Sequence, residues 1–147
     1  MKKEIFQEIC SQVFSSLQNN EQLTIYLEGE NSQYFRFNDS KLRQSGIIED
    51  YAVTISLFSG KKSLQAATTV SSDIKSSVNN LRNEIHALRD PLSLIPENEF
   101  TSFPDSFESV EMIKSGQLPD RNEILEALMD VITKDYLTGV WTSGKIF

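Results

Sequence analysis

The stretch YAVTISLF, residues 51–58, decides the fold class because its side chains alternate in character with a period of two. Val53, Ile55 and Leu57 fall on one side of an extended chain, and the small polar residues between them fall on the other. Ser59–Lys62 contains Gly60 and predicts a hairpin loop, so residues 63–70 form the next strand. Links of this length join antiparallel neighbours, whereas parallel strands need long crossovers. The sequence therefore predicts an antiparallel sheet with one buried face.

Further strands are predicted upstream of this stretch. Residues 23–28 and 33–37 alternate in the same way, with a turn predicted at residues 29–32 and another at residues 38–40. Residues 41–44 form a short extended piece before Ser45–Gly46. At the other end of the chain, residues 136–147 predict a strand, a glycine turn and the beginning of another strand.

Three amphipathic helices accompany the strands. Apolar residues recur every three or four positions over 3–18 and over roughly 73–89, where Asp73 can cap the start and Asp90–Pro91 is expected to end the helix. A third helix is predicted after Asp120, with Glu123 three residues later in a capping-box pattern. Residues 91–119 carry all four prolines and predict an irregular excursion, with a short helical turn near residues 106–113.

The predicted fold class is α+β: a two-layer sandwich in which a largely antiparallel meander of four or five strands is covered by helices. Residues 1–147 are expected to form a single α+β domain. The chain ends on an apolar pair, Ile146–Phe147, just as a strand begins, although termini are usually polar. This ending predicts the N-terminal part of a longer protein, with Trp141 and Phe147 buried against the portion that follows.

Composition excludes several classes of function. The chain has 147 residues, 14 Lys+Arg against 21 Asp+Glu, and a net charge of −7. An acidic surface does not favour direct nucleic-acid binding, because phosphate neutralisation needs basic residues. No apolar run is long enough to span a membrane, so no membrane partner is expected. Cys10 is the only cysteine, which favours the reducing cytoplasm.

Catalytic residue types are scarce. The sequence holds one histidine, His86, which lies off the apolar stripe of its predicted helix and is interpreted as a surface residue. Cys10 lies on the apolar face of the first helix and is interpreted as a small buried hydrophobe. Zinc sites need three or four ligands at paired spacings, and no such pair occurs. We therefore predict no catalytic residue, no metal site and no cofactor within this chain, which alone is not expected to be an enzyme.

Several segments resemble the N-terminal domain of the TldD/PmbA family, also called TldD/TldE and known as modulators of DNA gyrase. The resemblance is carried by FRFNDSKLRQSG (35–46), the strand 51–58, residues 60–62 and 65–69, the helix from Asp73, and GVWTSG (139–144). It covers roughly residues 5–90 and 120–147. The sequence of residues 35–46 is more similar to that of the TldE/PmbA-type subunits, which hold no metal.

The resemblance implies a role in peptide processing or degradation. TldD-type subunits of the family carry a His-Glu-x-x-x-His zinc motif and pair with TldE/PmbA-type subunits that lack it. The motif is absent here, so the resemblance assigns any zinc, and any metallopeptidase activity of the full-length protein, to a C-terminal half beyond this chain. The expected partners are a peptide or unfolded protein substrate, and a TldD/PmbA-type subunit in a homo- or hetero-oligomer.

Four polar residues of the recognisable stretch are candidate contacts for a peptide or partner: Arg36, Asn38, Arg43 and Gln44. An arginine can bind a carboxylate through two hydrogen bonds, and a sheet edge can pair with an extended backbone. The alternative is that Arg36 and Arg43 pair with acids on a solvated sheet face. The leading hypothesis is thus a non-catalytic domain that shapes a peptide-binding chamber. The alternatives are a non-enzymatic interaction module acting on a toxin, antitoxin or gyrase regulator, and a free-standing small-ligand domain.

Overall fold

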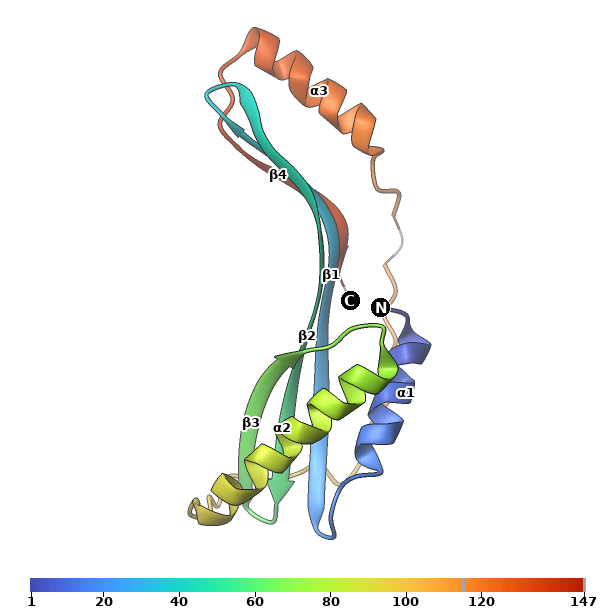
Figure 1. Cartoon of the computed structure of the whole chain (residues 1–147), viewed down its shortest axis with the longest axis vertical. Coiled ribbons are helices and arrows are strands. Elements are labelled where there is room, and N and C mark those ends of the chain that lie inside the picture. The colour runs from blue at the N-terminus through green and yellow to red at the C-terminus, as the bar shows by residue number, and fades with distance from the viewer. Residues whose placement is uncertain (115, 147) are drawn as a thin grey trace. The chain divides into compact units, whose positions relative to one another are not determined.

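The computed structural model describes residues 1–114 and 116–146, and it has an α+β fold with helices packing on an antiparallel sheet (Figure 1). Its elements in chain order are α1 (Lys3–Phe14), β1 (Glu21–Asn38), β2 (Lys41–Ser59), β3 (Lys62–Thr69), α2 (Ile74–Leu94), α3 (Arg121–Lys134) and β4 (Gly139–Ile146). The strand order across the sheet is β3-β2-β1-β4. The predicted fold class is confirmed.

The chain divides into two compact units. Residues 1–29 and 51–109 form unit 1, and residues 30–50 together with the described residues from 110 onward form unit 2. The long strands β1 and β2 each contribute one half to each unit.

Unit 1 contains the main hydrophobic core, which lies between its sheet and the helices α1 and α2 (Figure 1). Val53, Ile55 and Leu57 of β2 are fully buried, as their alternation predicts. The other buried core residues of this cluster are Ile9, Val13, Leu23, Tyr51, Val70, Val78, Leu81, Ile85 and Leu92. Each such side chain stabilises the fold by about 1.5–3 kcal/mol relative to an exposed position.

The irregular segment after α2 covers part of the second face of this sheet. Phe58 points to the opposite side from Leu57, and Phe103 packs edge-on against it with ring centroids 5.2 Å apart. Phe107 continues the row at 5.6 Å from Phe103. Ser56, on the same side as Phe58, is buried as well. The helical turn predicted near residues 106–113 is absent, and an extended aromatic contact takes its place.

Two predicted helix ends are corrected by the structure. α1 ends at Phe14 rather than near residue 18, because Ser16 and Leu17 form the tighter three-residue backbone bonds to Val13 and Phe14. α2 does not stop at Asp90–Pro91 but continues to Leu94. Proline removes one backbone donor, and the burial of Leu92 in the core offsets that loss by holding the last turn in place.

Unit 2 consists of the second half of β1, the first half of β2, β4 and α3. β4 pairs antiparallel with β1, from Phe37 opposite Gly139 to Glu30 opposite Ile146. Phe35 and Phe37 are buried, Trp141 stacks on Phe35 at 5.6 Å, and the Arg121 guanidinium of α3 lies 4.9 Å from the Phe35 ring centroid.

The predicted start of α3 is confirmed, whereas the predicted burial of the last aromatic residues is seen only in part. Asp120 caps α3 by accepting from the backbone N–H of Asn122 and Glu123, as predicted. Trp141 is half-buried, and Phe147, which was also expected to be buried, lies outside the described residues.

Three predicted breaks in the strands are wrong. Residues 29–32 do not form a turn but lie within β1, and the extended piece at residues 41–44 does not end before Ser45–Gly46 but continues through it as β2. Gly144 also lies within a strand, opposite Ser32, where an added Cβ would sit 2.4 Å from the Ser32 Cα. Pairing with a neighbouring strand overrides the local turn composition at these positions. The turn between β1 and β2 falls at Asp39–Ser40, whose φ angles of 54° and 50° match a two-residue hairpin loop.

Candidate functional site

Arg36 and Asn38 lie at the end of β1 that leads into the hairpin turn. Their neighbours Phe35 and Phe37 are buried, so strand alternation places Arg36 and Asn38 on the opposite face of the sheet. Both are exposed to solvent. The strand thus presents two polar residues outward while its aromatic residues hold it in unit 2.

Arg43 and Gln44 follow the turn on β2, and both are exposed. The Arg43 Nε donates a hydrogen bond to the Asn38 backbone oxygen at 3.3 Å, so the hairpin brings these two residues together. Arg43 and Gln44 are adjacent in a strand and therefore point to opposite faces. The four predicted contact residues thus share one hairpin but cannot all act on the same face.

An open strand edge lies beside Arg36. Arg36 is opposite Val140 of β4, which is 62% exposed. Within the described residues β4 is the last strand of the sheet, so its outer backbone groups face no other strand. An extended peptide can add to such an edge through main-chain hydrogen bonds, and a guanidinium on the neighbouring strand can then bind a carboxylate.

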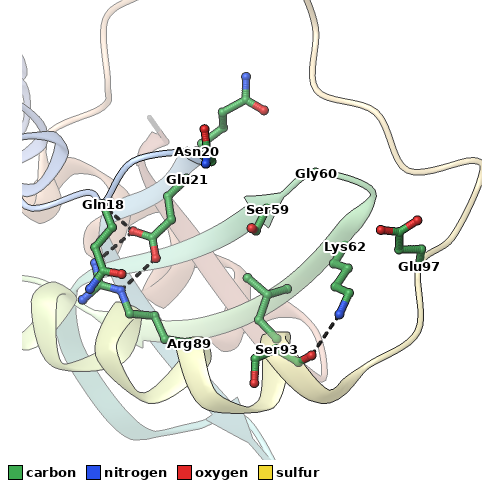
Figure 2. A pocket seen from close by; sticks show the side chains of 11 residues that line it. Gln18, Asn20, Glu21, Ser59, Gly60, Lys62, Arg89, Ser93 and Glu97 are labelled. Atoms are coloured by element: carbon green, nitrogen blue, oxygen red, sulfur yellow. Dashed lines mark hydrogen bonds and ion pairs between the residues drawn. The ribbon is translucent and has the colours of Figure 1, made fainter.

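Unit 1 holds a separate polar pocket of about 920 Å³ (Figure 2). It is formed by the link from α1 to β1, the turn between β2 and β3, and the end of α2 and the residues after it. These three segments are far apart in the sequence, so no local sequence pattern indicates the pocket. The composition of Ser59–Lys62, for example, predicts a turn but does not indicate that this turn borders a cavity.

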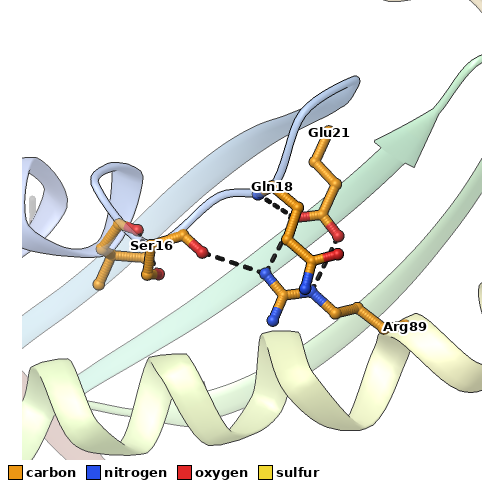
Figure 3. Close-up of polar contacts among 5 residues, drawn as sticks. Ser16, Gln18, Glu21 and Arg89 are labelled. Carbon is orange, nitrogen blue, oxygen red and sulfur yellow. Dashed lines mark hydrogen bonds and ion pairs between the residues drawn. The ribbon is translucent and has the colours of Figure 1, made fainter.

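An ion pair between Arg89 and Glu21 forms one wall of this pocket (Figure 3). The Arg89 guanidinium donates to both carboxylate oxygens, at 2.8 and 2.9 Å, and to the Ser16 backbone oxygen at 3.1 Å. The Gln18 backbone N–H also donates to the Glu21 carboxylate, at 2.7 Å. The pair thereby joins α2 to the end of α1 and the start of β1.

The ion pair changes the acidity of both partners. Its hydrogen bonds hold the pKa of Glu21 below its ordinary value, because Arg89 favours the charged carboxylate. The pKa of Arg89 is raised by the same hydrogen bonds. Each partner thus favours the charged form of the other.

Lys62, another charged residue of the pocket, also serves the fold. The Lys62 ammonium donates to the Ser93 backbone oxygen at 2.9 Å, near the C-terminal end of α2, where a cation is favourable (Figure 2). The preceding residue in the turn, Lys61, accepts at its backbone oxygen a hydrogen bond from the Asn98 N–H at 3.0 Å. We therefore interpret the pocket as a junction that fixes the end of α2.

Of the two residues that could carry covalent chemistry, His86 lies on the surface as predicted, whereas Cys10 is less buried than predicted. His86 is exposed on α2, off the buried stripe. Cys10 is half-buried, and burial raises its pKa to about 11, so it is a thiol rather than a nucleophilic thiolate at neutral pH. Among residues 1–114 and 116–146, no group of three or more His, Cys, Asp or Glu side chains could hold a metal ion. The helices of this part of the chain also include none long and apolar enough to cross a membrane.

The fold, in which α1 and α2 cover the sheet of unit 1 and the last strand, β4, pairs with β1, is similar to that of a solved TldE. TldE from Thermococcus kodakarensis matches 97% of this chain with a TM-score of 0.66 at 12% sequence identity. The resemblance inferred from the sequence is thus confirmed at the level of the fold. The chain spans 36% of the length of that TldE.

A proposed modulator of a DNA gyrase from Thermotoga maritima matches 72% of the chain, and this chain covers 23% of that protein. The identity is 14% and the TM-score is 0.44. No protein-family model and no curated protein matches the sequence.

Proposed function

We propose that this chain is the non-catalytic N-terminal part of a TldD/PmbA-like, peptidase-related protein, and that it shapes a chamber for an extended peptide. The observation that carries the proposal is the TldE fold, which extends over 97% of the chain. The match spans 36% of that TldE, so the activity, the substrate and the partner of the whole protein are part of the proposal.

In this proposal, the outer edge of β4 pairs with the peptide backbone. Arg36, on the strand next to β4, binds a carboxylate of the peptide, and Asn38 adds a neutral polar contact. Arg43 and Gln44 extend the contact surface around the hairpin. The exposure of these side chains supports the assignment, because a peptide can reach them without any change in the core.

Bond cleavage is assigned to residues outside this chain. Zinc, where the whole protein uses it, would be held by those residues, and a TldD/PmbA-type subunit is the proposed partner. The exposed His86 and the protonated Cys10 support a role in shape and binding rather than in bond breaking. We place the protein in the cytoplasm, where the single thiol of this chain would remain reduced.

The test is a binding measurement with fluorescein-labelled extended peptides, one rich in Glu and one with Gln in the same positions. We expect the Glu peptide to bind more tightly and the Arg36→Ala variant to lose about tenfold in affinity, because a charge-assisted hydrogen bond is worth about 1.5–3 kcal/mol and Arg36 is exposed. Lys75→Ala is the matched control, since it removes the same charge from an exposed position on α2.

Two results would contradict the proposal. One is equal binding of both peptides by the wild type and by Arg36→Ala, which would place recognition elsewhere. The other is peptide hydrolysis by the purified 147-residue chain that a chelator abolishes, since this would place a catalytic metal within it.

A further inference from the structure

The hairpin that joins β1 to β2 brings basic residues of the two strands together. β1 ends at Asn38 and β2 begins at Lys41, so residues 39–40, both with positive φ, form the whole loop. A two-residue loop pairs the residues on either side of it, Asn38 with Lys41, and two positions further along the strands it places Arg36 opposite Arg43. The hydrogen bond from the Arg43 Nε to the Asn38 backbone oxygen fits this register.

Arg36, Lys41 and Arg43 therefore lie on the same face of the hairpin. Residues directly opposite each other on antiparallel strands share a face, and so do residues two apart in one strand. Their Cβ atoms are separated by about 5 Å in the first case and about 7 Å in the second. All three side chains are exposed to solvent. These three residues form the hairpin cation cluster, whose charged groups can converge on one ligand above the sheet.

No carboxylate neutralises the hairpin cation cluster within residues 1–114 and 116–146. In this part of the chain no ion pair joins an acid to any of the three side chains, and the Arg43 Nε binds a neutral backbone oxygen. Acids are plentiful elsewhere, since the chain carries a net charge of −7. Like charges directly opposite each other on neighbouring strands are destabilising. The cluster therefore favours an anion that the described side chains do not supply.

The number and kind of the cations favour a phosphoryl group. A single carboxylate is matched by one guanidinium group, which binds its two oxygens side by side. A phosphoryl group carries nearly two negative charges at neutral pH and has three oxygens that accept hydrogen bonds, so it can bind two guanidinium groups and an ammonium group at once. We propose that Arg36, Lys41 and Arg43 bind a phosphoryl group, whether of free phosphate, of a small phosphate ester or of a phosphorylated side chain.

This inference goes beyond the peptide-binding role. It shares Arg36 with the proposed peptide contact, but it requires neither the outer edge of β4 nor a peptide backbone. Phosphate can therefore bind at the hairpin when no peptide pairs with β4, and a peptide can pair with β4 when the hairpin binds no phosphate. The two proposals can fail separately.

The test is a titration of the 15N-labelled 147-residue chain with inorganic phosphate, followed by NMR, with sodium chloride added to keep the ionic strength constant. We expect the amide signals of residues 36–43 to shift and saturate in the wild type. The R36Q/R43Q variant should bind at least about tenfold more weakly, because it loses the charge-assisted hydrogen bonds of both guanidinium groups. K41Q should bind about twofold to fivefold more weakly, the size expected for one exposed charge pair.

The matched control is K75Q/K145Q, which removes the same total charge from exposed positions on α2 and β4 and should bind phosphate as the wild type does. Equal losses in K75Q/K145Q and R36Q/R43Q would overturn the proposal, because binding would then depend on net charge alone. Retained affinity in R36Q/R43Q, with circular dichroism confirming that the variant is folded, would overturn it as well. So would equal shifts caused by sodium chloride alone, or acetate binding as tight as that of phosphate.

A phosphoserine peptide and its unphosphorylated form distinguish the sources of the phosphoryl group. Tighter binding of the phosphoserine peptide than of inorganic phosphate would support a phosphorylated chain as the ligand. Equal binding of the two would support free phosphate or a small ester. Equal binding of the phosphorylated and unphosphorylated peptides, without any response to inorganic phosphate, would overturn the phosphoryl site and leave the peptide-binding proposal standing.

Discussion

Replacing Arg89 with alanine should destabilise the protein more than any other single change of a charged residue in unit 1. The change removes two hydrogen bonds to Glu21 and one to the Ser16 backbone oxygen. The Glu21 carboxylate, which is 8% exposed, then keeps the hydrogen bond from the Gln18 N–H but loses its charged partner. Removing one partner of a fully buried pair costs about 3–5 kcal/mol. Because the Arg89 side chain is 22% exposed, we expect a loss of about 2–3 kcal/mol.

The assay is urea unfolding followed by far-ultraviolet circular dichroism, supported by thermal unfolding, where the loss corresponds to about 5–10 °C. Arg82→Ala is the matched control, because Arg82 is an exposed arginine of the same helix with one hydrogen bond, to the Gln12 backbone oxygen. It should cost less than about 1 kcal/mol. A double-mutant cycle with Glu21→Gln isolates the pair. A coupling energy near zero, or equal losses for Arg89→Ala and Arg82→Ala, would refute the reasoning.

The same pair predicts how stability depends on pH. The folded-state pKa of Glu21 lies below its ordinary value of 4.5. The stabilisation is therefore fully present above the pKa of the unfolded state and is lost as the pH falls through the folded pKa. The wild type should thus lose more stability than Arg89→Ala on acidification below about pH 4.5. Parallel curves for the two proteins would contradict this prediction.

Three further predictions follow from burial and backbone packing. Leu81→Ala should cost about 3 kcal/mol because Leu81 is fully buried, whereas Leu94→Ala, at an 84% exposed position, should cost under about 0.5 kcal/mol by urea unfolding. Cys10 should react slowly with a thiol reagent at neutral pH, since its pKa is about 11, and quickly once the chain is unfolded; equal rates would contradict its burial. Gly144→Ala should cost about 1–3 kcal/mol, because the new methyl would meet the Ser32 backbone; a neutral effect in thermal unfolding would show that β4 can shift.

Much of the fold could be predicted from local patterns. The alternation in residues 51–58 predicts a buried strand, and the Asp120 cap predicts the start of α3, because each signal acts within a few residues. The errors occur where distant contacts decide. Residues 29–32 read as a turn, but Ser32 is held in a strand by Gly144, and no local pattern reports that partner. Pro91 reads as a stop, but the burial of Leu92 extends the helix.

The candidate site could be predicted only in part. The residues of the hairpin at positions 36–44 are close in sequence, so their grouping follows from a single turn. Arg43 and Gln44 are adjacent in a predicted extended segment, so alternation alone places them on opposite faces. Which of these faces Arg36 and Asn38 share depends on the register between β1 and β2, which the sequence does not reveal. The pocket at Arg89 combines three distant segments, so only the folded chain brings Glu21 and Lys62 to the same cavity.

The pairing of β4, the last strand of the chain, with β1, the first, has a consequence for synthesis on the ribosome. Residues 30–37 of β1 emerge early, yet their partner strand is made only after both α2 and α3 have been translated. Throughout that interval, the nascent chain exposes the side of β1 that β4 will later occupy. Pairings between residues so distant in sequence form slowly, and an exposed strand of this kind can bind a neighbouring nascent chain instead. Slower translation through residues 110–138 would lengthen this period, so the demand for chaperones should depend on how fast that segment is made.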